Sequence, residues 1–418
     1  MLPYYTSDET PQKVLRVPLP KSQALILQNE TLSCENVRVR PLTMEDAETK
    51  VHDLFLDVLR KRNFRVNNVE VKPLSSGGAN YTSALFAATA RADTGADLSI
   101  FAKVALVGEK MRQVMDADTM FATEGIVYTE LVVYYDIIQT QHKIKIFDFP
   151  EMFACDLTRG SETLLLEDLT KLGFSAPSRH NSAEWRFAAA AISKLAAFHA
   201  LSFAFEKHKP EEFQRMADRF KYKEIERDEE TMKEMWVKII GNAVQVVKDE
   251  YKGRIAKHLA ETKQEFPKFK RPINKTVLVH GDYRTSNLLF KEKTVYTGSP
   301  AADVLYFIFL GTNQEFRKNH YRPLLDHYYQ ELAAAVVKMG VDINEEYPRE
   351  MFDSEIKETL PNALRLSSFI LPIVTVDEAA APSMGGEADA TQFAIAPNQL
   401  FAERFSGLVD DCVEWGVL

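Results

Sequence analysis

Cysteine is scarce in this sequence. The 418 residues include only three, Cys34, Cys155 and Cys412, and these lie far apart. Structural zinc sites use closely spaced cysteine pairs, and small disulfide-stapled domains need several cysteines in a short chain. The spacing fits neither arrangement, so it indicates a reducing compartment such as the cytoplasm.

Positive charge is also in short supply. Lysine and arginine together number 51 against 60 acidic residues, which gives a net charge of −9 at pH 7. An acidic chain is a poor candidate for general nucleic-acid binding, although it can still carry a local basic pocket for phosphates. We therefore expect a small-molecule partner and no nucleic acid. The composition says nothing about the oligomeric state.

No uninterrupted apolar run is long enough to cross a membrane. The most apolar stretch, residues 188–205, contains Lys194 and His199, so it predicts a buried helix. The first residues lack a basic start followed by an apolar core, which is the pattern of a secretory signal. We expect a cytoplasmic protein that does not bind membranes.

A P-loop is missing as well, because no Gly-Lys-Ser or Gly-Lys-Thr follows a glycine-rich turn. A different glycine-rich stretch, residues 75–83, joins predicted strands at 69–74 and 84–92. Small residues let the backbone approach an anion closely, and successive amides can form a nest for phosphate oxygens. Its candidate phosphate-binding residues are Gly77, Gly78 and Asn80. The same composition is also typical of an ordinary hairpin turn.

A lysine lies inside the next apolar strand, predicted over residues 98–106. Lys103 needs a partner or a ligand if it is buried there, and protein kinases place such a lysine on their third strand to bind phosphates. An edge-strand lysine that points to solvent is the alternative. A helix predicted over residues 117–139 follows and carries Glu124 on its apolar face, together with Phe121 and Tyr128. We predict an ion pair between Lys103 and Glu124.

The most specific motif lies between two short apolar runs in residues 277–290. His280, Asp282 and Asn287 match the spacing H-x-D-x-x-x-x-N of the kinase catalytic loop, with Gly281 in place of arginine. In that loop the aspartate accepts the proton of the attacking hydroxyl and the asparagine holds magnesium. A Gly-Asp turn between two strands is the simpler alternative. Histidines 199 and 280 are more typical of interior hydrogen-bonding residues than of catalysts.

Periodic apolar residues predict helices through much of the remaining chain. Thr43 with Asp46 forms a weak capping box for the first helix, and Pro300 marks the start of a later one. Residues 377–390, rich in alanine, glycine and acids, predict a mobile loop. The predicted helices cover residues 43–62, a segment from 182 through His199, 231–247, a segment from 300, 317–339, 350–370 and 398–412.

Together these motifs, in this order, resemble the ecdysteroid-kinase-like, or CHK-kinase-like, family. That family belongs to the aminoglycoside/choline kinase branch of the protein-kinase-like fold. The resemblance covers about residues 43–339. The residues that carry it lie at 78–83, Lys103, Phe121 with Glu124 and Tyr128, 166–169, 195–200, 280–287 and 298–307.

The resemblance implies an α+β, two-lobed protein-kinase-like fold. It has an extension over residues 1–42, a small antiparallel-sheet lobe over 43–164 and a larger, mainly helical lobe over 165–418. The implied activity is phosphorylation of a small-molecule hydroxyl by ATP with Mg²⁺, with ecdysteroids among the substrates. The implied roles are Asp282 as base, Asn287 as metal ligand, Lys103 as phosphate binder, Glu124 as its orienting partner, and Glu167 and Leu169 in the adenine-binding hinge.

One departure from the family pattern concerns the metal. Family members carry a strand ending in Asp-Phe-Gln between the catalytic loop and Gly-Ser-Pro, and its aspartate is the main magnesium ligand. Here residues 288–297 contain no aspartate, and Glu292 is their only acid. Asp303 falls at the position that anchors the catalytic loop. Either this chain is catalytically weak or a segment is missing.

Three functions stay open at this level. The first is an ATP:alcohol phosphotransferase, and the second is a non-catalytic protein that binds a nucleotide or a small ligand. The third is a kinase for choline-like substrates, with Tyr134, Tyr135 and Trp185 as a cation cage, although core packing explains these aromatics better.

Overall fold

The computed structural model describes residues 25–27, 42–75, 82–93, 95–175, 177–223, 229–261, 269, 271–288, 295–381 and 390–418. The chain divides into two compact units. The first comprises Met1–Gly125, Phe149–Ala176 and Asp377–Asp389, and the second comprises Ile126–Asp148, Pro177–Val376 and Ala390–Leu418. The division that the sequence predicts, between residues 164 and 165, falls inside a strand of the first unit.

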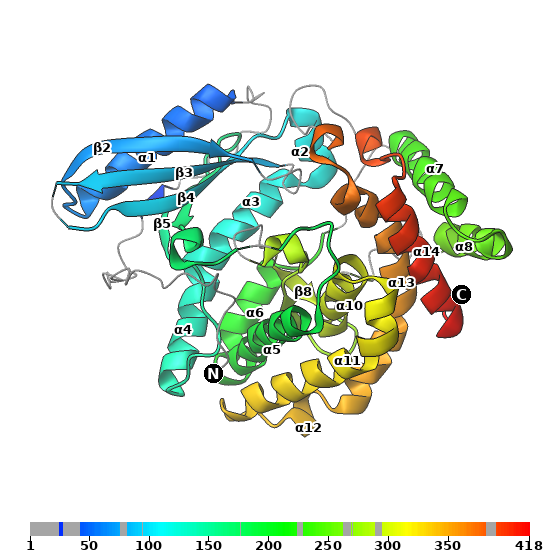
Figure 1. The fold of residues 1–418 in the computed structure, drawn as a ribbon. Helices are drawn as coiled ribbons and strands as arrows, with labels where there is room; N and C mark the ends of the chain where they lie inside the picture. Colours follow the sequence, from blue (N-terminus) through cyan, green and yellow to red (C-terminus); the bar gives the residue numbers. More distant parts are fainter. Residues whose placement is uncertain are drawn as a thin grey trace. The chain divides into compact units, whose positions relative to one another are not determined.

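The first unit contains a six-stranded sheet with the order β1-β5-β6-β4-β3-β2. Figure 1 labels its strands β2, β3, β4 and β5. Every pair of neighbours is antiparallel except β1 and β5, which run parallel. The short β1 lies in the expected extension over residues 1–42. The strands are β1 (Leu25–Leu27), β2 (Val66–Leu74), β3 (Ser83–Ala92), β4 (Leu98–Ala105), β5 (Met152–Asp156) and β6 (Thr163–Glu167).

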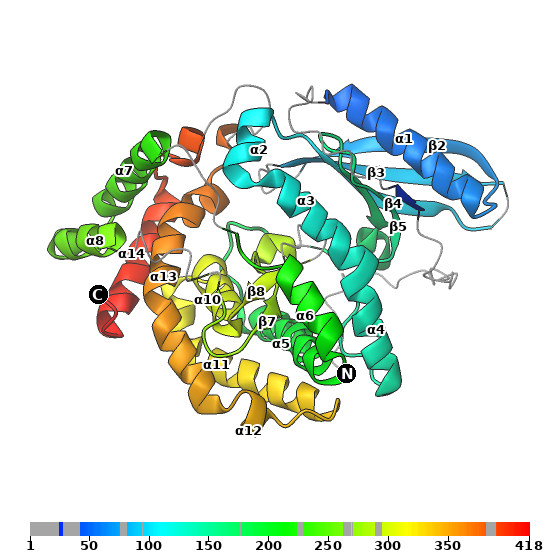
Figure 2. The same cartoon turned by 180° about the vertical axis from the view of Figure 1, so that it is seen from behind.

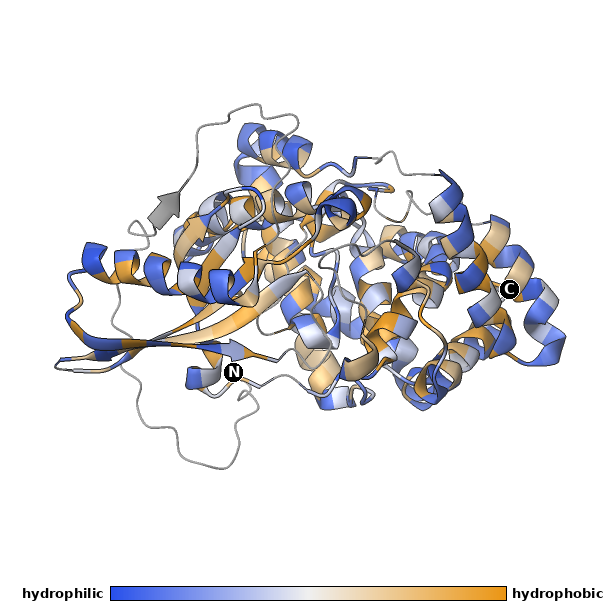
Figure 3. Ribbon diagram, turned by 90° about the horizontal axis from the view of Figure 1, so that it is seen from above, coloured by the Kyte–Doolittle hydropathy of each residue, from blue (hydrophilic) through white to orange (hydrophobic). Residues whose placement is uncertain are grey.

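Helix α1 (Met44–Lys61) covers one face of this sheet. Thr43 caps it as predicted: the Thr43 side chain accepts from the Asp46 amide, and the Asp46 side chain accepts from the Thr43 amide. Hydrophobic and hydrophilic residues alternate along the helix that lies over the sheet (Figure 3). Each buried leucine, valine or phenylalanine stabilises the packing by about 1.5–3 kcal/mol. The buried residues of α1 are Ala47, Val51, Leu54, Phe55, Val58 and Leu59.

A run of helical segments follows β4. Helix α2 (Glu109–Met115), which the sequence did not predict, ends at Asp116, whose φ of 53° breaks the helix. The predicted helix over 117–139 is confirmed as three consecutive segments: α3 (Ala117–Ile126), the π-helical η2 (Val127–Leu131) and α4 (Val132–Gln141). The division between the two units falls at the end of α3, after Gly125.

Two short 3-10 segments complete the described part of the first unit. They are η3 (Leu169–Leu172), capped by the Asp168 side chain, and η6 (Glu378–Ala380). The second of these lies in the predicted mobile loop, most of which falls outside the described residues.

The second unit is mainly helical (Figure 2). Its described helices are α4, α5 (Trp185–His208), α6 (Pro210–Arg219), α7 (Glu229–Gln245), α8 (Asp249–Glu261), α10 (Pro300–Gly311), α11 (Gln314–Val337), α12 (Ile343–Glu346), α13 (Arg349–Thr375) and α14 (Gln399–Glu414). Two three-residue strands, β7 (Val277–Val279) and β8 (Tyr296–Gly298), pair antiparallel. The segments η5 (Thr285–Asn287) and η7 (Ala390–Phe393) are 3-10 helices.

Helix α5 is the one described helix that is long and apolar enough to cross a membrane, but 72% of its most apolar window is buried within the protein. The prediction of a buried helix is confirmed. The α+β fold class is confirmed too, because a small, mostly antiparallel sheet forms one unit and helices dominate the other.

Candidate functional site

Lys103 lies in the interior of the sheet. In β4 it is paired with Leu85 of β3 on one side and with Leu164 of β6 on the other. Its neighbours Ala102 and Val104 belong to the core beneath α1, so strand alternation turns Lys103 to the opposite face. The side chain is only 3% exposed. The alternative of a solvent-facing edge lysine is therefore wrong.

The Lys103 ammonium forms an ion pair with a carboxylate from α3, as predicted. Its Nζ lies 2.5 Å from Glu124 Oε2, and the Glu124 side chain is 4% exposed. The Phe121 ring, one turn earlier on α3, has its centroid 5.5 Å from the same Nζ, within the range of a cation–π contact. Burying two charges is costly and contributes little net stability compared with apolar packing. A gain in folding stability is therefore a weak explanation for the pair.

The glycine-rich stretch cannot be compared with its prediction, because Gly77, Gly78 and Asn80 lie outside the described residues. Its flank is defined: the Thr82 carbonyl accepts from the Leu106 amide at 3.0 Å. This hydrogen bond joins the residue just before β3 to the residue just after β4. The phosphate-binding role of the stretch stays a prediction.

The predicted hinge residues lie at the end of β6 and just beyond it. The Glu167 amide donates to the Glu151 carbonyl at 2.8 Å, and Glu167 Oε2 accepts from the Glu151 amide at 3.2 Å. Leu169 begins η3, and its carbonyl accepts from the Phe174 amide at 3.2 Å. These bonds hold the segment in place but occupy the Leu169 carbonyl. Adenine recognition by these two residues stays a prediction.

In the second unit, Asp303 of α10 holds the backbone of the loop that carries the H-x-D-x-x-x-x-N motif. Asp303 Oδ2 accepts from the His280 amide at 2.6 Å, and Oδ1 accepts from the Gly281 amide at 2.8 Å. Gly281 has a φ of 80°, a conformation that side chains rarely adopt. Both carboxylate oxygens are thus committed to the loop. This agrees with the anchoring position that the resemblance gave to Asp303.

His199 supports that carboxylate from α5. Its Nε2 lies 3.1 Å from Asp303 Oδ2, and its Nδ1 lies 2.7 Å from the Tyr328 hydroxyl. The ring is fully buried. His199 is therefore a satisfied interior histidine, as expected.

Asp282 is surrounded by hydrogen-bond donors. Its Oδ1 accepts from Arg284 Nε at 3.0 Å and from the Tyr306 hydroxyl at 2.7 Å, and its Oδ2 accepts from Asn287 Nδ2 at 2.5 Å. Three donors on one carboxyl group suit its ionised form. Burial and the nearby Asp282 charge raise the pKa of Tyr306 well above its ordinary value, so the tyrosine stays a proton donor.

Sequence reasoning missed both Arg284 and Tyr306. Arg284 follows Asp282 by two residues inside the loop motif, so its proximity was a usable signal. Tyr306 lies on α10 in a run of apolar residues, where it looks like a core aromatic. Only the packing of α10 against the loop brings its hydroxyl to Asp282.

Asn287 offers an oxygen to a cation. Its Nδ2 donates to the Asp282 carbonyl at 2.9 Å as well as to the carboxylate. Its buried Oδ1 has no hydrogen-bond partner among the described residues. Magnesium prefers oxygen ligands and is usually held through carboxylates with phosphates and water. The amide oxygen therefore fits the metal, but it is a weak ligand on its own.

No group of three or more histidine, cysteine or acidic side chains suited to a metal occurs in the described part of the chain. The interval that lacks the Asp-Phe-Gln strand is residues 288–297, and its residues 289–294 lie outside that part. Strand β8 pairs directly with β7, with Val279 opposite Tyr296. Residues 296–298, just before Ser299, therefore already form β8 and pair with β7.

A second buried carboxylate, Glu355 of α13, links the segment before β7 to the N-cap of α10. It is fully buried. Its Oε1 accepts from the Asn274 amide at 3.1 Å and from Asn274 Nδ2 at 3.2 Å, while its Oε2 accepts from the Tyr347 hydroxyl at 2.6 Å and from the Ser299 hydroxyl. Asn274 precedes β7, and Ser299 caps α10. No pattern in the sequence indicated this role.

The aromatic residues considered as a cation cage pack on different partners. Tyr134 stacks on Phe205 with centroids 4.7 Å apart, and Tyr135 contacts the edge of the same ring. Trp185 lies instead against two histidines of α11, His320 and His327. Ordinary packing accounts for these contacts.

Comparison with known proteins identifies one family. The model of the ecdysteroid kinase-like family matches residues 77–341, which is more than half of the chain. The match includes every candidate residue from Gly77 to Asn287 and ends before Glu355. No curated protein sequence matches the chain.

Proposed function

The chain belongs to the ecdysteroid kinase-like family, and from this premise we propose that it is an ATP-dependent phosphotransferase. Its acceptor is the hydroxyl group of a small molecule, an ecdysteroid or a related alcohol, in the cytoplasm. The observation that carries the proposal is the buried ion pair between Lys103 and Glu124. Neither nucleic acid nor membrane is part of the proposed activity.

The ion pair suits a phosphate ligand. A buried ammonium needs a negative partner, and Glu124 supplies one while it fixes the direction of the lysine stem. An ATP phosphate would add a second set of acceptors for the three donors of the ammonium. Kinases use a strand lysine with a helix glutamate in this way. The flanking glycine-rich stretch would supply backbone amides to the same phosphates.

Asp282 suits the role of base. As the hydroxyl oxygen of the acceptor forms its bond to the γ-phosphorus, the bond from that phosphorus to ADP breaks, and the hydroxyl proton passes to the Asp282 carboxylate. The donors Arg284, Tyr306 and Asn287 fix the carboxylate so that it needs little reorganisation. Arg284 also places a positive charge within the loop.

Magnesium, when bound, would neutralise phosphate charge, and Asn287 is the described residue that fits it. Without a carboxylate ligand the metal would be held by a neutral oxygen, phosphates and water. Losing that ligand costs several kcal/mol of transition-state stabilisation, a rate loss of roughly a thousandfold or more. We therefore propose that this chain turns over slowly.

The absence of the Asp-Phe-Gln metal ligand also supports a second proposed function. A protein that binds a nucleotide or a small ligand without catalysis needs Lys103 and Glu124 but not the missing aspartate. Both functions predict binding, and only the first predicts any turnover. Turnover of an alcohol above the rate of an Asp282→Asn variant separates them.

The first experiment asks whether ATP binds through Lys103. A ligand that binds only the folded state raises the melting temperature by mass action. We expect ATP to raise it for the unchanged protein and to have no effect on Lys103→Met. Lys275→Met is the matched control, because Lys275 is a partly buried lysine paired with Glu206 and Glu346 in the second unit. An equal shift in the Lys103 variant would show that ATP does not use this site.

A further inference from the structure

A buried arginine lies at the start of the helical run that carries Glu124. Arg112 of α2 has a side chain that is 2% exposed. Its Nη1 and Nη2 donate to the two oxygens of Glu162 at 2.8 and 2.6 Å, and Nη1 also donates to Asp118 Oδ1 at 2.6 Å. Burial opposes its charge, but the bonds to Glu162 and Asp118 raise its pKa above the ordinary value. Arg112 therefore keeps its positive charge and connects Glu162 to Asp118.

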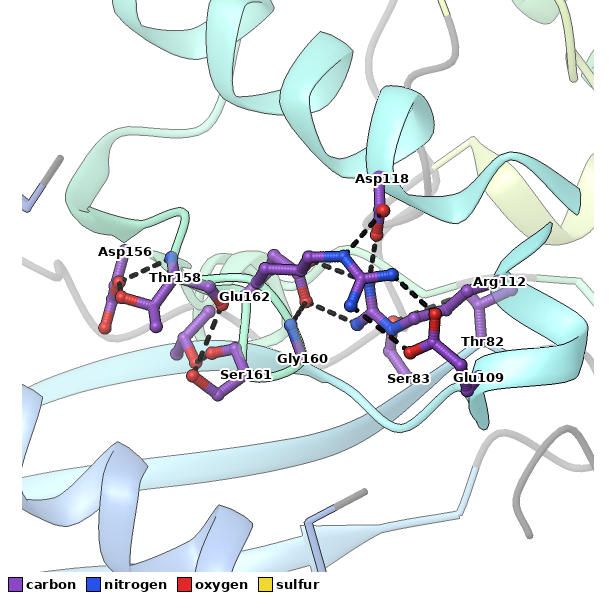
Figure 4. A network of polar contacts seen from close by, with 12 residues as sticks. Thr82, Ser83, Glu109, Arg112, Asp118, Asp156, Thr158, Gly160, Ser161 and Glu162 are labelled. Atoms are coloured by element: carbon purple, nitrogen blue, oxygen red, sulfur yellow. Dashed lines mark hydrogen bonds and ion pairs between the residues drawn. The ribbon is translucent and has the colours of Figure 1, made fainter. Parts of the chain in front are cut away.

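Figure 4 labels Glu109, Arg112, Asp118 and Glu162 of this network, and a second arginine extends it. Arg159 donates from Nε to Asp118 at 2.8 Å and from Nη2 to Glu109 at 2.8 Å. Asp118 therefore lies between two guanidinium groups. It belongs to the first turn of α3, where a carboxylate also interacts favourably with the helix dipole.

The other end of the network is fixed to the sheet. Glu162 immediately precedes β6, and its carbonyl accepts from the Ala105 amide at 2.8 Å. Ala105 ends β4 two residues after Lys103. The Gly160 amide also donates to Glu162 Oε2 at 3.1 Å. Arg112 thus connects the first turn of α3 to the strand ends beside Lys103.

Two further contacts place α3 on the same side of the sheet. The Phe121 ring lies between two cations, with its centroid 5.5 Å from Lys103 Nζ and 5.9 Å from Arg112 Cζ. At the end of α3, a Cβ added to Gly125 would lie 2.8 Å from the Leu157 side chain. The helix is therefore held at its first turn by charge, in its middle by an aromatic ring and at its last turn by close contact.

We propose that Arg112 is a positioning residue that fixes the register of α3, so that Glu124 reaches Lys103. The inference rests on the proposed function for its biological meaning, because the position of Lys103 matters for nucleotide phosphates. It does not need ATP for its test. Lysine at position 112 would keep the charge but lose the planar fork that contacts both carboxylates.

The test measures how fast Lys103 is acetylated by an amine-reactive acetylating reagent, without nucleotide, by mass spectrometry. A buried, ion-paired ammonium reacts only when its surroundings open. We expect Arg112→Lys to raise the Lys103 rate by about tenfold, because local opening then precedes reaction more often. Asp118→Asn should act in the same direction, and its half-exposed side chain makes loss of folding a minor concern.

Internal references separate a shift of α3 from general loosening. Lys50 of α1, paired with Asp156, reports on the first unit, and Lys275 reports on the second. Both rates should stay unchanged in the two variants. Arg349→Lys is the matched control, since Arg349 also contacts two carboxylates, Asp326 and Asp353, in the second unit.

Three results would overturn the proposal: an unchanged Lys103 rate, equal increases at Lys103 and Lys50, or the same increase in Arg349→Lys. A protein that fails to bind ATP would refute the proposed function and leave this test valid. A tenfold more frequent opening leaves the closed state dominant, so the dissociation constant of ATP should stay nearly unchanged in Arg112→Lys and in Arg349→Lys.

Discussion

The lysine site and the catalytic loop are held in place by different kinds of contact. In the first unit, the position of Glu124 depends on ion pairs between side chains, with Arg112 and Lys103 as the cations. In the second unit, carboxylates accept from backbone amides: Asp303 from His280 and Gly281, and Glu355 from Asn274. Contacts to backbone fix a main chain, whereas ion pairs fix the register of a helix.

This difference has a functional consequence. Under the proposed function, the loop must present Asp282 and Asn287 at fixed positions, so its backbone must not move. A phosphate-binding lysine needs only the correct charge and direction. Side-chain ion pairs are therefore sufficient in the first unit, and they are also easier to disturb by a single conservative substitution.

The largest effect should come from restoring the missing metal ligand. Inserting Ile-Asp-Phe-Gln before Tyr296 should raise the rate of phosphoryl transfer by roughly a thousandfold or more, because a carboxylate then helps to hold the magnesium that neutralises the phosphates. The measurement is ADP release with a panel of steroid and choline-like alcohols. An Ile-Asn-Phe-Gln insertion is the matched control and should stay slow. If the unmodified chain is as fast as the restored one, another acid must hold the metal.

The next effect concerns the backbone contacts of the loop. Asp303→Asn puts an amide NH₂ where the carboxylate accepts from two main-chain amides, which leaves a buried donor without a partner. We expect a loss of about 3 kcal/mol in the free energy of unfolding, measured by urea denaturation. Asp342→Asn is the control, since asparagine replaces an exposed N-cap aspartate equally well. Equal losses would show that the Asp303 contacts are not special.

A smaller loss is expected when Glu355 becomes glutamine. Glutamine keeps the shape and one acceptor oxygen, but its NH₂ meets the Tyr347 and Ser299 hydroxyls or the Asn274 groups. Hydroxyls can rotate to accept, so the loss should be about 1–2 kcal/mol. Urea denaturation measures it, and Lys103 acetylation should not change. A change at Lys103 would show that the two units do not respond separately to this substitution.

The smallest effect is a pH dependence that differs between the units. Burial lowers the pKa of His258 below its ordinary 6.5, although its bond to the Pro361 carbonyl acts in the opposite direction. A lowered pKa means that the stabilisation is present above about 6.5 and is lost as the pH falls. Stability of the second unit should therefore decline below pH 6.5. His258→Gln should reduce this decline in urea denaturation.

In the first unit, the group whose pKa is lowered is the Asp156 carboxyl, which titrates at a lower pH than His258. Burial opposes ionisation of Asp156, but hydrogen bonds from Lys50 and Thr158 outweigh it and lower the pKa below 3.8. Its contribution is present above that value and is lost only as the pH falls further. A stability loss between pH 6.5 and 5 that Asp156→Asn removes would contradict this assignment.

The sequence by itself determined much of the local structure. Apolar periodicity located α1, α5, α11 and α13, and the Thr43 capping box marked a helix start that the structure confirms. Charge in an apolar strand identified Lys103, and helical spacing selected Glu124 as its partner. These inferences succeeded because each depends on contacts with near neighbours in the chain or on the cost of burying a charge.

Only the tertiary structure decided which distant residues support these sites. Arg112 meets Glu162 across fifty positions, Tyr306 reaches Asp282 from an apolar helix, and Glu355 lies beyond the matched family region. A buried polar residue satisfies its hydrogen bonds wherever the packed chain offers a partner. No periodicity records that partner, so the sequence could name the candidate lysine, base and metal ligand but not the residues that hold them in position.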